Sequence, residues 1–180
     1  MIKVRYFKRG VSWFLDYFIC QVVIYAVIGL LWMKMSNEES IETSLLQMPK
    51  DSALILGFIA IIITVFYYFI IPAFFMKNQT IAKRIFNIKI ISNTKNKLSI
   101  KQLFLRQVIG LLFIDAYLSA STIFIIQLLE INLNADIAMY FEIYFMLMTI
   151  ISVALTIFSA KHLAIHDWLA KTDIIEEGEK

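Results

Sequence analysis

An aspartate inside a long apolar run is the feature that most constrains what this chain can fold into. Asp16 lies within residues 11–33, a run that contains no other acidic or basic side chain. The run is long enough to cross a bilayer, because a spanning helix needs about 20 mostly apolar residues. A carboxylate there costs on the order of 2.5–3.5 kcal/mol, so Asp16 should face protein or water. Arg9 shares its helical face but lies about 10 Å away along the axis, so Asp16 needs a partner from elsewhere in the chain.

The composition extends this interpretation to the whole chain. Of its 180 residues 60% are hydrophobic and 17% are charged, whereas soluble domains are about 45–50% apolar and about 25% charged. The additional hydrophobic residues lie in blocks long enough to cross a bilayer. This pattern predicts a single all-α membrane domain over residues 1–180 with four transmembrane helices. The predicted spans cover about residues 11–33, 52–75, 108–129 and 137–159.

Charge sets the expected orientation. Eight of the 17 Lys and Arg residues lie in the loop 76–107, four precede the first span and three follow the last. This positive-inside pattern predicts that the loop, the tail 160–180 and both termini are cytoplasmic, in a prokaryotic plasma membrane. The same charges are suited to anionic lipid headgroups at the inner surface, and their closeness to the membrane disfavours nucleic-acid binding.

The loop and the tail are expected to contain short structured elements. Thr80 and Ser99 are suitable N-caps for two short amphipathic helices, the second of which runs into the third span. Residues 89–92 favour a short strand. In the tail, residues 161–170 favour an interfacial helix, and residues 173–176 favour a second strand that is able to pair with the first.

Several segments, taken together and in order, resemble the RDD family of prokaryotic membrane proteins, named for one arginine and two aspartates. Arg9 and Asp16 match the arginine and the aspartate of the first span. Residues 80–91, TIAKRIFNIKII, look like the family's TPGKRLLGLRVV segment, and Ser99 begins a stretch similar to its LSxxxxLxR. Residues 161–172, KHLAIHDWLAKT, are similar to its RRxLHDxLAGT ending, which makes Asp167 the candidate second aspartate.

Four departures from these motifs fall at positions where the family has no charge. Ile81 replaces proline, and Ala82, Asn87 and Lys171 replace glycines, which puts the tight-turn geometry of those sites in question. The resemblance implies a multi-pass membrane protein with a role in transport, since sodium–proton exchange is associated with some members.

Two buried carboxylates are the candidate site. Asp16 and Asp115 are both expected about 8–10 Å inside the inner end of their spans, where they can share one polar site. Such a pair can bind a cation or hold a proton. The alternative is structural: each acid forms a salt bridge with Lys83, Arg84 or Arg106 and only fastens the cytoplasmic layer to the bundle.

His162 and His166 are four residues apart, a spacing that is able to hold a transition metal. No third ligand of defined geometry accompanies them, so we expect no metal here. Instead, His166 and Asp167 are expected to hydrogen-bond to Arg9 or Arg84. The chain also has no P-loop, nucleophile elbow or Gly-rich phosphate cradle, so neither an enzyme nor a cofactor is predicted.

Two function classes remain open. In the first, the chain is a cation or proton-coupled transporter, expected to be a homo-oligomer: Asp16 and Asp115 bind the ion, Arg9 and Asp167 gate the inner mouth, and Glu142 marks an outer path. The alternative for Glu142 is an interfacial side chain that reaches water. In the second class, the chain is a non-transporting accessory or self-protection protein that binds another membrane complex. A hydrated cavity reaching Asp16 would favour the first class, and an unpacked apolar face would favour the second.

Overall fold

The computed structural model describes residues 2–3, 6–37, 40–94, 97–159 and 162–176. The α-helices are α1 Tyr6–Ser36, α2 Lys50–Val65, α3 Ile81–Ile85, α4 Ile100–Phe104, α5 Thr122–Asn132, α6 Ala135–Phe158 and α7 Ile165–Ala170. Two π-helical segments, η2 Phe66–Phe75 and η3 Leu105–Ile114, and two short 3-10 turns, η1 Leu45–Gln47 and η4 Ala116–Leu118, connect them. The strands are β1 Ile2–Lys3, β2 Ile88–Ser92 and β3 Thr172–Glu176.

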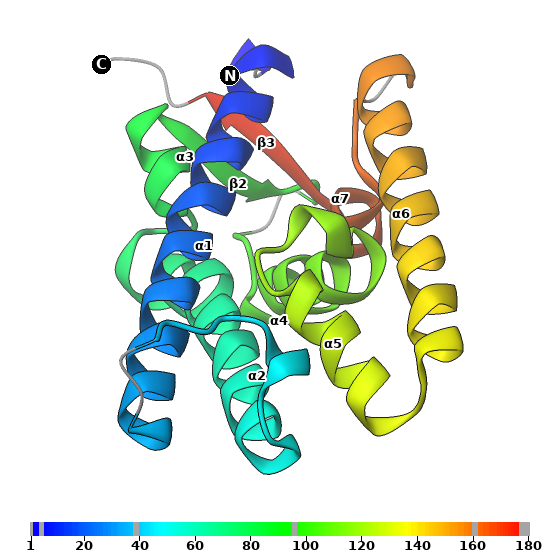
Figure 1. Ribbon diagram of the computed structural model, residues 1–180. Helices are drawn as coiled ribbons and strands as arrows, with labels where there is room; N and C mark the ends of the chain where they lie inside the picture. The colour runs from blue at the N-terminus through cyan, green and yellow to red at the C-terminus, as the bar shows by residue number, and fades with distance from the viewer. Residues whose placement is uncertain (1, 4–5, 38–39, 95–96, 160–161, 177–180) are drawn as a thin grey trace.

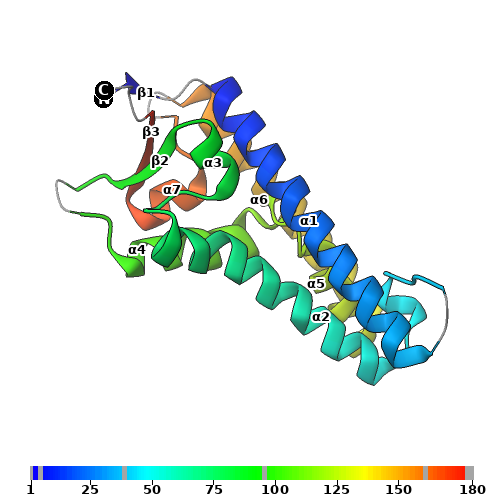
Figure 2. The same cartoon turned by 90° about the vertical axis from the view of Figure 1, so that its left-hand side faces the viewer.

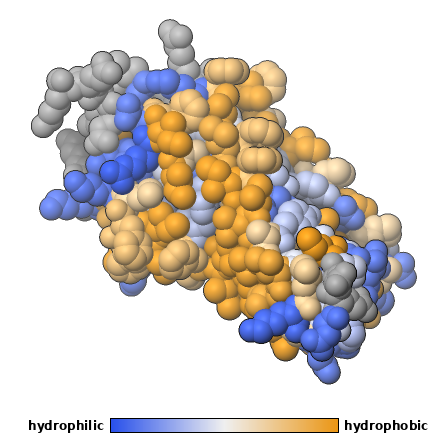
Figure 3. All heavy atoms as spheres, turned by 60° about the vertical axis from the view of Figure 1, so that its left-hand side comes forward, coloured by the Kyte–Doolittle hydropathy of each residue, from blue (hydrophilic) through white to orange (hydrophobic). Residues whose placement is uncertain are grey.

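The long helices form a bundle with the small sheet at one end (Figures 1 and 2). We call the part built from the sheet, α3, α4 and α7 the sheet end. In the described part of the chain, three helices are long and apolar enough to cross a membrane: Phe7–Ser36, Lys50–Phe75 and Ala135–Phe158. Figure 3 shows a broad apolar band over the helices with hydrophilic residues at both ends, as expected for a membrane protein.

The predicted third span does not form one helix, so the count of four spans is not confirmed. The backbone leaves the helix at Asp115, whose N–H donates to the carbonyl of Gly110 at 2.8 Å. The hydroxyl of Thr122 then donates to backbone carbonyls upstream, that of Ser119 at 3.0 Å among them. Such local side-chain bonds compete with helical backbone bonds. Residues 108–129 are therefore divided between η3, η4 and the 11-residue α5.

The apolar core lies where α1, α2 and α5 meet. Ile24 and Ile28 of α1, Leu56 of α2 and Phe124 of α5 are all fully buried. Gly57 allows α2 to approach α5 closely, because a Cβ at this position would lie 2.7 Å from the side chain of Leu128. Helix α6 packs mainly on α5, and many of its apolar side chains stay exposed, as expected for a helix in contact with lipid.

The sheet confirms the predicted strand pairing. β2 and β3 are antiparallel, with Ile90 opposite Ile174, and β1 pairs with the other edge of β3. The predicted cap at Ser99 is also confirmed. Its hydroxyl accepts from the backbone N–H of Gln102 at 3.2 Å, and the Gln102 side chain accepts from the backbone N–H of Ser99 at 3.2 Å. These bonds fix the start of α4, which continues into η3.

The tail helix is shorter than predicted. α7 begins at Ile165 rather than at residue 161, because His162 adopts a left-handed backbone with φ 55°. The carboxylate of Asp167 accepts from the N–H of Ala164 at 3.2 Å and so fixes the first turn. His162 and His166 therefore do not share a helical face, and the predicted geometry of a histidine pair is wrong. Residues 160–161 and 177–180 of the predicted tail lie outside the described residues.

Candidate functional site

Three fully buried aspartates, Asp16, Asp115 and Asp167, lie at the junction between the bundle and the sheet end. An isolated ionised carboxylate in such surroundings would be strongly unfavourable, so each needs a cation or several hydrogen bonds. Each of the three does have an ion-pair partner: Lys83 for Asp16, His166 for Asp115, and Arg9 and Arg106 for Asp167. Nε2 of His166 also lies 3.5 Å from Oδ1 of Asp167 and so links the second and third sites. The expectation that Asp16 and Asp115 share one site is thus replaced by separate sites.

Asp16 ties α1 to η2 and α3. Its carboxylate accepts from the hydroxyl of Tyr67 at 2.7 Å, the backbone N–H of Ala82 at 3.0 Å and the Nζ of Lys83 at 3.1 Å. It also accepts from the hydroxyl of Thr80. Thr80 occupies the N-cap position of α3, as predicted, but its side chain serves Asp16 instead of its own helix. The carboxylate of Asp16 thus accepts hydrogen bonds from four donors.

Asp167 ties α7 to η3 and α1. The Nε and Nη2 of Arg106 donate to its Oδ1 at 2.8 and 2.5 Å, and Arg9 donates to its Oδ2. Burial by itself raises the pKa of Asp167, but Arg106 and Arg9 outweigh it and hold the pKa well below its usual range. The bond to Arg9 confirms one of the two partners expected from the sequence for Asp167. The other, Arg84, is exposed on α3, and Asp167 pairs with Arg106 instead.

Asp115 meets His166 where the third predicted span breaks. The Nδ1 of His166 bonds to Oδ2 of Asp115, while Oδ1 has no hydrogen-bond partner among the described residues. Gly110 makes this approach sterically feasible, since a Cβ there would lie 2.4 Å from the Cβ of His166. From the sequence, Arg9 or Arg84 was expected beside His166, whereas Nε2 of His166 lies 3.4 Å from Nη2 of Arg106. The partnership with Asp115 was missed because it depends on the break.

Glu142 lies on α6 apart from these groups. Its side chain is exposed and accepts from the hydroxyl of Tyr117 at 2.9 Å. Within the described ranges, no group of three or more His, Cys, Asp or Glu side chains is arranged to hold a metal ion. His162, the second histidine of the tail, contacts the carbonyl of Thr156 through Nδ1 at 3.2 Å.

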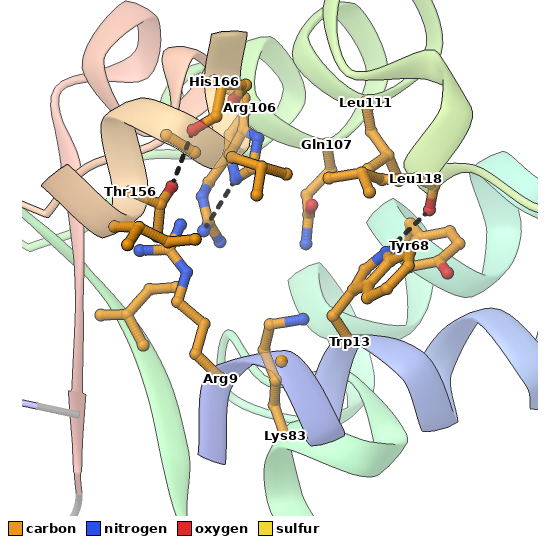
Figure 4. Close-up of a pocket in the computed structure, with 16 residues that line it drawn as sticks. Arg9, Trp13, Tyr68, Lys83, Arg106, Gln107, Leu111, Leu118, Thr156 and His166 are labelled. Atoms are coloured by element: carbon orange, nitrogen blue, oxygen red, sulfur yellow. Dashed lines mark hydrogen bonds between the residues drawn. The ribbon is translucent and has the colours of Figure 1, made fainter. Parts of the chain in front are cut away.

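A cavity of about 320 Å³ adjoins all three ion-pair sites (Figure 4). Its polar lining comprises the partners of the aspartates and their neighbours, together with two hydroxyl residues of α6: Arg9, Lys83, Arg106, His166, Gln107, Tyr68, Ser152 and Thr156. The three aspartates themselves are not among the lining residues. Burial lowers the pKa of Lys83 and outweighs the opposite effect of Asp16. The cavity is therefore bordered by cations and hydrogen-bond donors, a set of residues that sequence spacing alone does not bring together.

Comparison with known proteins places the chain in a family. No curated protein and no solved structure matches it. The model of the RDD family matches residues 4–171, nearly the entire chain and every residue of the ion-pair sites described above. The chain therefore belongs to the RDD family.

Proposed function

We propose that this membrane protein is a small proton-coupled transporter in the plasma membrane of a prokaryotic cell, with both termini and the sheet end in the cytoplasm. The positive-inside pattern supports this orientation, because the loop 76–107 joins the sheet end and holds eight of the 17 Lys and Arg residues. The proposed route passes through the cavity between α1 and α6. A few spanning helices enclose little room for an aqueous route. The proposal therefore includes a homo-oligomer.

The observation that carries the proposal is the pair of Asp115 and His166 beside the cavity. His166 lines the cavity, and its imidazole bonds to a fully buried carboxylate that keeps one unpartnered oxygen in the described part of the chain. Histidine is the side chain that ordinarily exchanges protons near neutral pH. Ionisable groups at membrane depth are typical of proton relays. In this proposal the imidazole passes protons between the cavity and Asp115.

The proposal gives Asp16 and Asp167 structural roles rather than the ion-binding and gating roles expected from the sequence. A sodium ion at Asp16 would have to displace the ammonium of Lys83, which lies 3.1 Å from the carboxylate. The cation of Arg9 is likewise engaged with Asp167. Coupling to protons is therefore favoured over coupling to sodium. Glu142, exposed on α6, is retained as the outer end of the route.

The second candidate function is that of an accessory or self-protection protein that binds another membrane complex. Helix α6 supports it, because only a narrow stripe of this helix is buried, namely Ala138, Phe145, Thr149 and Ser152. The remaining apolar surface is suited either to lipid or to a helix of another membrane protein. Anionic lipid headgroups beside the basic sheet end are proposed partners in both cases.

Flux into proteoliposomes tests the proposal. We expect the purified chain to carry protons under an imposed pH gradient, read with an internal pH-sensitive dye, and Asp115→Asn to abolish that flux. Asp51→Asn is the matched control, because this acid lies exposed in the first turn of α2. Absence of flux in the wild type would favour the accessory function. Full flux in Asp115→Asn would remove that carboxylate from the route.

A further inference from the structure

We propose that the cavity binds amphiphilic phosphates, that is, molecules with a phosphate ester head and an apolar group. The proposal concerns binding and does not rest on transport, since a chain that moves nothing would still hold such a molecule. Three features carry it: buried donors without a partner among the described residues, cationic side chains on the wall with their aspartates behind them, and apolar lining from two membrane helices.

Unpaired donors are the first feature. Nη1 of Arg106, Nε2 of Gln107 and the hydroxyl of Tyr68 have no hydrogen-bond partner in the part of the chain that the structure describes. These residues are only 2%, 6% and 2% exposed, and all three line the cavity. Buried polar groups in proteins are nearly always hydrogen-bonded. Three unpaired groups on one cavity therefore indicate a ligand that accepts several hydrogen bonds.

The charge on the wall is the second feature. Arg106 donates from Nε and Nη2 to Asp167, and its Nη1 has no hydrogen-bond partner among the described residues. The ammonium of Lys83 bonds to Asp16 and to Thr80, and an ammonium has a third N–H to donate. Figure 4 shows the Nζ of Lys83 and the side chain of Gln107 directed into the same space.

A phosphate matches these donors better than a carboxylate does. It offers more acceptor oxygens than a carboxylate, so one phosphate is able to accept from Nη1 of Arg106, Nε2 of Gln107 and the ammonium of Lys83 together. The lowered pKa of Lys83 is consistent with this, because burial and the neighbouring Arg106 and Arg9 all disfavour its charged form. A bound anion would oppose each of these effects.

The apolar wall is the third feature. Trp13 of α1, Leu118 of η4 and Val153 and Ile157 of α6 supply apolar lining to the cavity. Trp13 is seven residues from the start of α1, about 10 Å along the axis, and Ile157 lies next to the end of α6. At this depth lipid headgroups meet acyl chains. The ligand would thus place its phosphate toward the sheet end and its apolar group between α1 and α6.

Calorimetric titration of the full-length protein in a non-ionic detergent tests the proposal. Dodecyl phosphate should bind saturably and at least roughly 10-fold more tightly than dodecanol. Gln107→Leu should weaken dodecyl phosphate roughly 10-fold or more, since it removes a donor to a charged group. This variant leaves every aspartate ion pair in place, and its melting temperature without ligand should be unchanged or higher. Gln47→Leu is the control, because Gln47 is exposed on η1. This variant should bind dodecyl phosphate with the affinity of the wild type.

Two further arms identify the source of the phosphate. Retention of phosphatidic acid through native mass spectrometry of nanodiscs would support a lipid ligand, and binding of the short-chain hexyl phosphate without lipid retention would support a soluble one. Equal affinity for dodecanol and dodecyl phosphate, no saturable binding, or full affinity in Gln107→Leu would each overturn the proposal. Binding without proton flux would refute only the transport function.

Discussion

Replacing Asp167 with asparagine tests whether buried ion pairs hold the sheet end on the bundle. The side chain joins α7 to η3 through Arg106 and to α1 through Arg9. Asparagine keeps the shape but removes the negative charge, and Arg106, only 2% exposed, would lose its counter-charge. Removing one partner of a buried pair costs about 3–5 kcal/mol. We expect Asp167→Asn to lower the free energy of unfolding by that amount, a large part of the roughly 5–15 kcal/mol typical of folded proteins.

A partly exposed ion pair in the same part of the molecule provides the matched control. Lys8 on α1 pairs with Glu176 on β3, and their side chains are 40% and 26% exposed. Pairs in contact with solvent contribute about 0–1 kcal/mol, because water screens the charges. Glu176→Gln is the same acid-to-amide change and also removes a link between α1 and the sheet end. The difference between the two variants therefore measures what the buried site of Asp167, with its two arginines and the Ala164 N–H, contributes beyond a solvent-exposed pair.

Reversible denaturant unfolding in mixed micelles, followed by circular dichroism, measures both variants. The pKa of Asp167 lies well below its unfolded value of about 3.9, so its carboxylate stabilises the fold above that pH. That contribution is lost as the pH falls below about 4 toward the folded pKa. The gap between wild type and Asp167→Asn should hold from pH 7 to about 5 and shrink below about 4. A loss of under about 1 kcal/mol at pH 7, equal to that of Glu176→Gln, would refute the reasoning.

Three further predictions address the same architecture. Tyr67→Phe should cost about 1.5–3 kcal/mol of unfolding free energy, because it removes a 2.7 Å hydrogen bond to a buried carboxylate; unchanged stability would contradict this. Gly110→Ala should cost about 1–3 kcal/mol by overpacking against α7, whereas Gly10→Ala, which meets nothing within 4 Å, should be tolerated in the same assay. In sealed cells lacking the native cysteine, a cysteine at Asn37 should react with an impermeant thiol reagent and one at Thr94 should not; labelling at Thr94 would reverse the proposed orientation.

The helices and the strand pair were predictable because their signals are local. Hydropathy identified three spans, and short β-branched apolar runs between polar residues identified β2 and β3. Ion-pair partners were harder to predict, because adjacent residues of the same charge are equivalent candidates when only the sequence is known. Lys83 and Arg84 illustrate this: the hydroxyl of Thr80 bonds to Asp16, and Lys83, three residues on, lies on the same face of α3 and reaches the same carboxylate. Arg84 is turned away and exposed.

The break at Asp115 was missed for a related reason, because hydropathy averages over the few polar side chains that cause it. Its consequences extend beyond local geometry. Ending η3 at Asp115 places that carboxylate against His166, and the turn that follows exposes the carbonyl of Leu118, which accepts from the indole N–H of Trp13 at 3.0 Å. A continuous helix would satisfy that carbonyl internally and would offer no contact to α1. The interruption therefore makes two contacts beside the cavity, one with His166 and one with Trp13. Asp115, where the helical span ends, is thus also a residue of the candidate site.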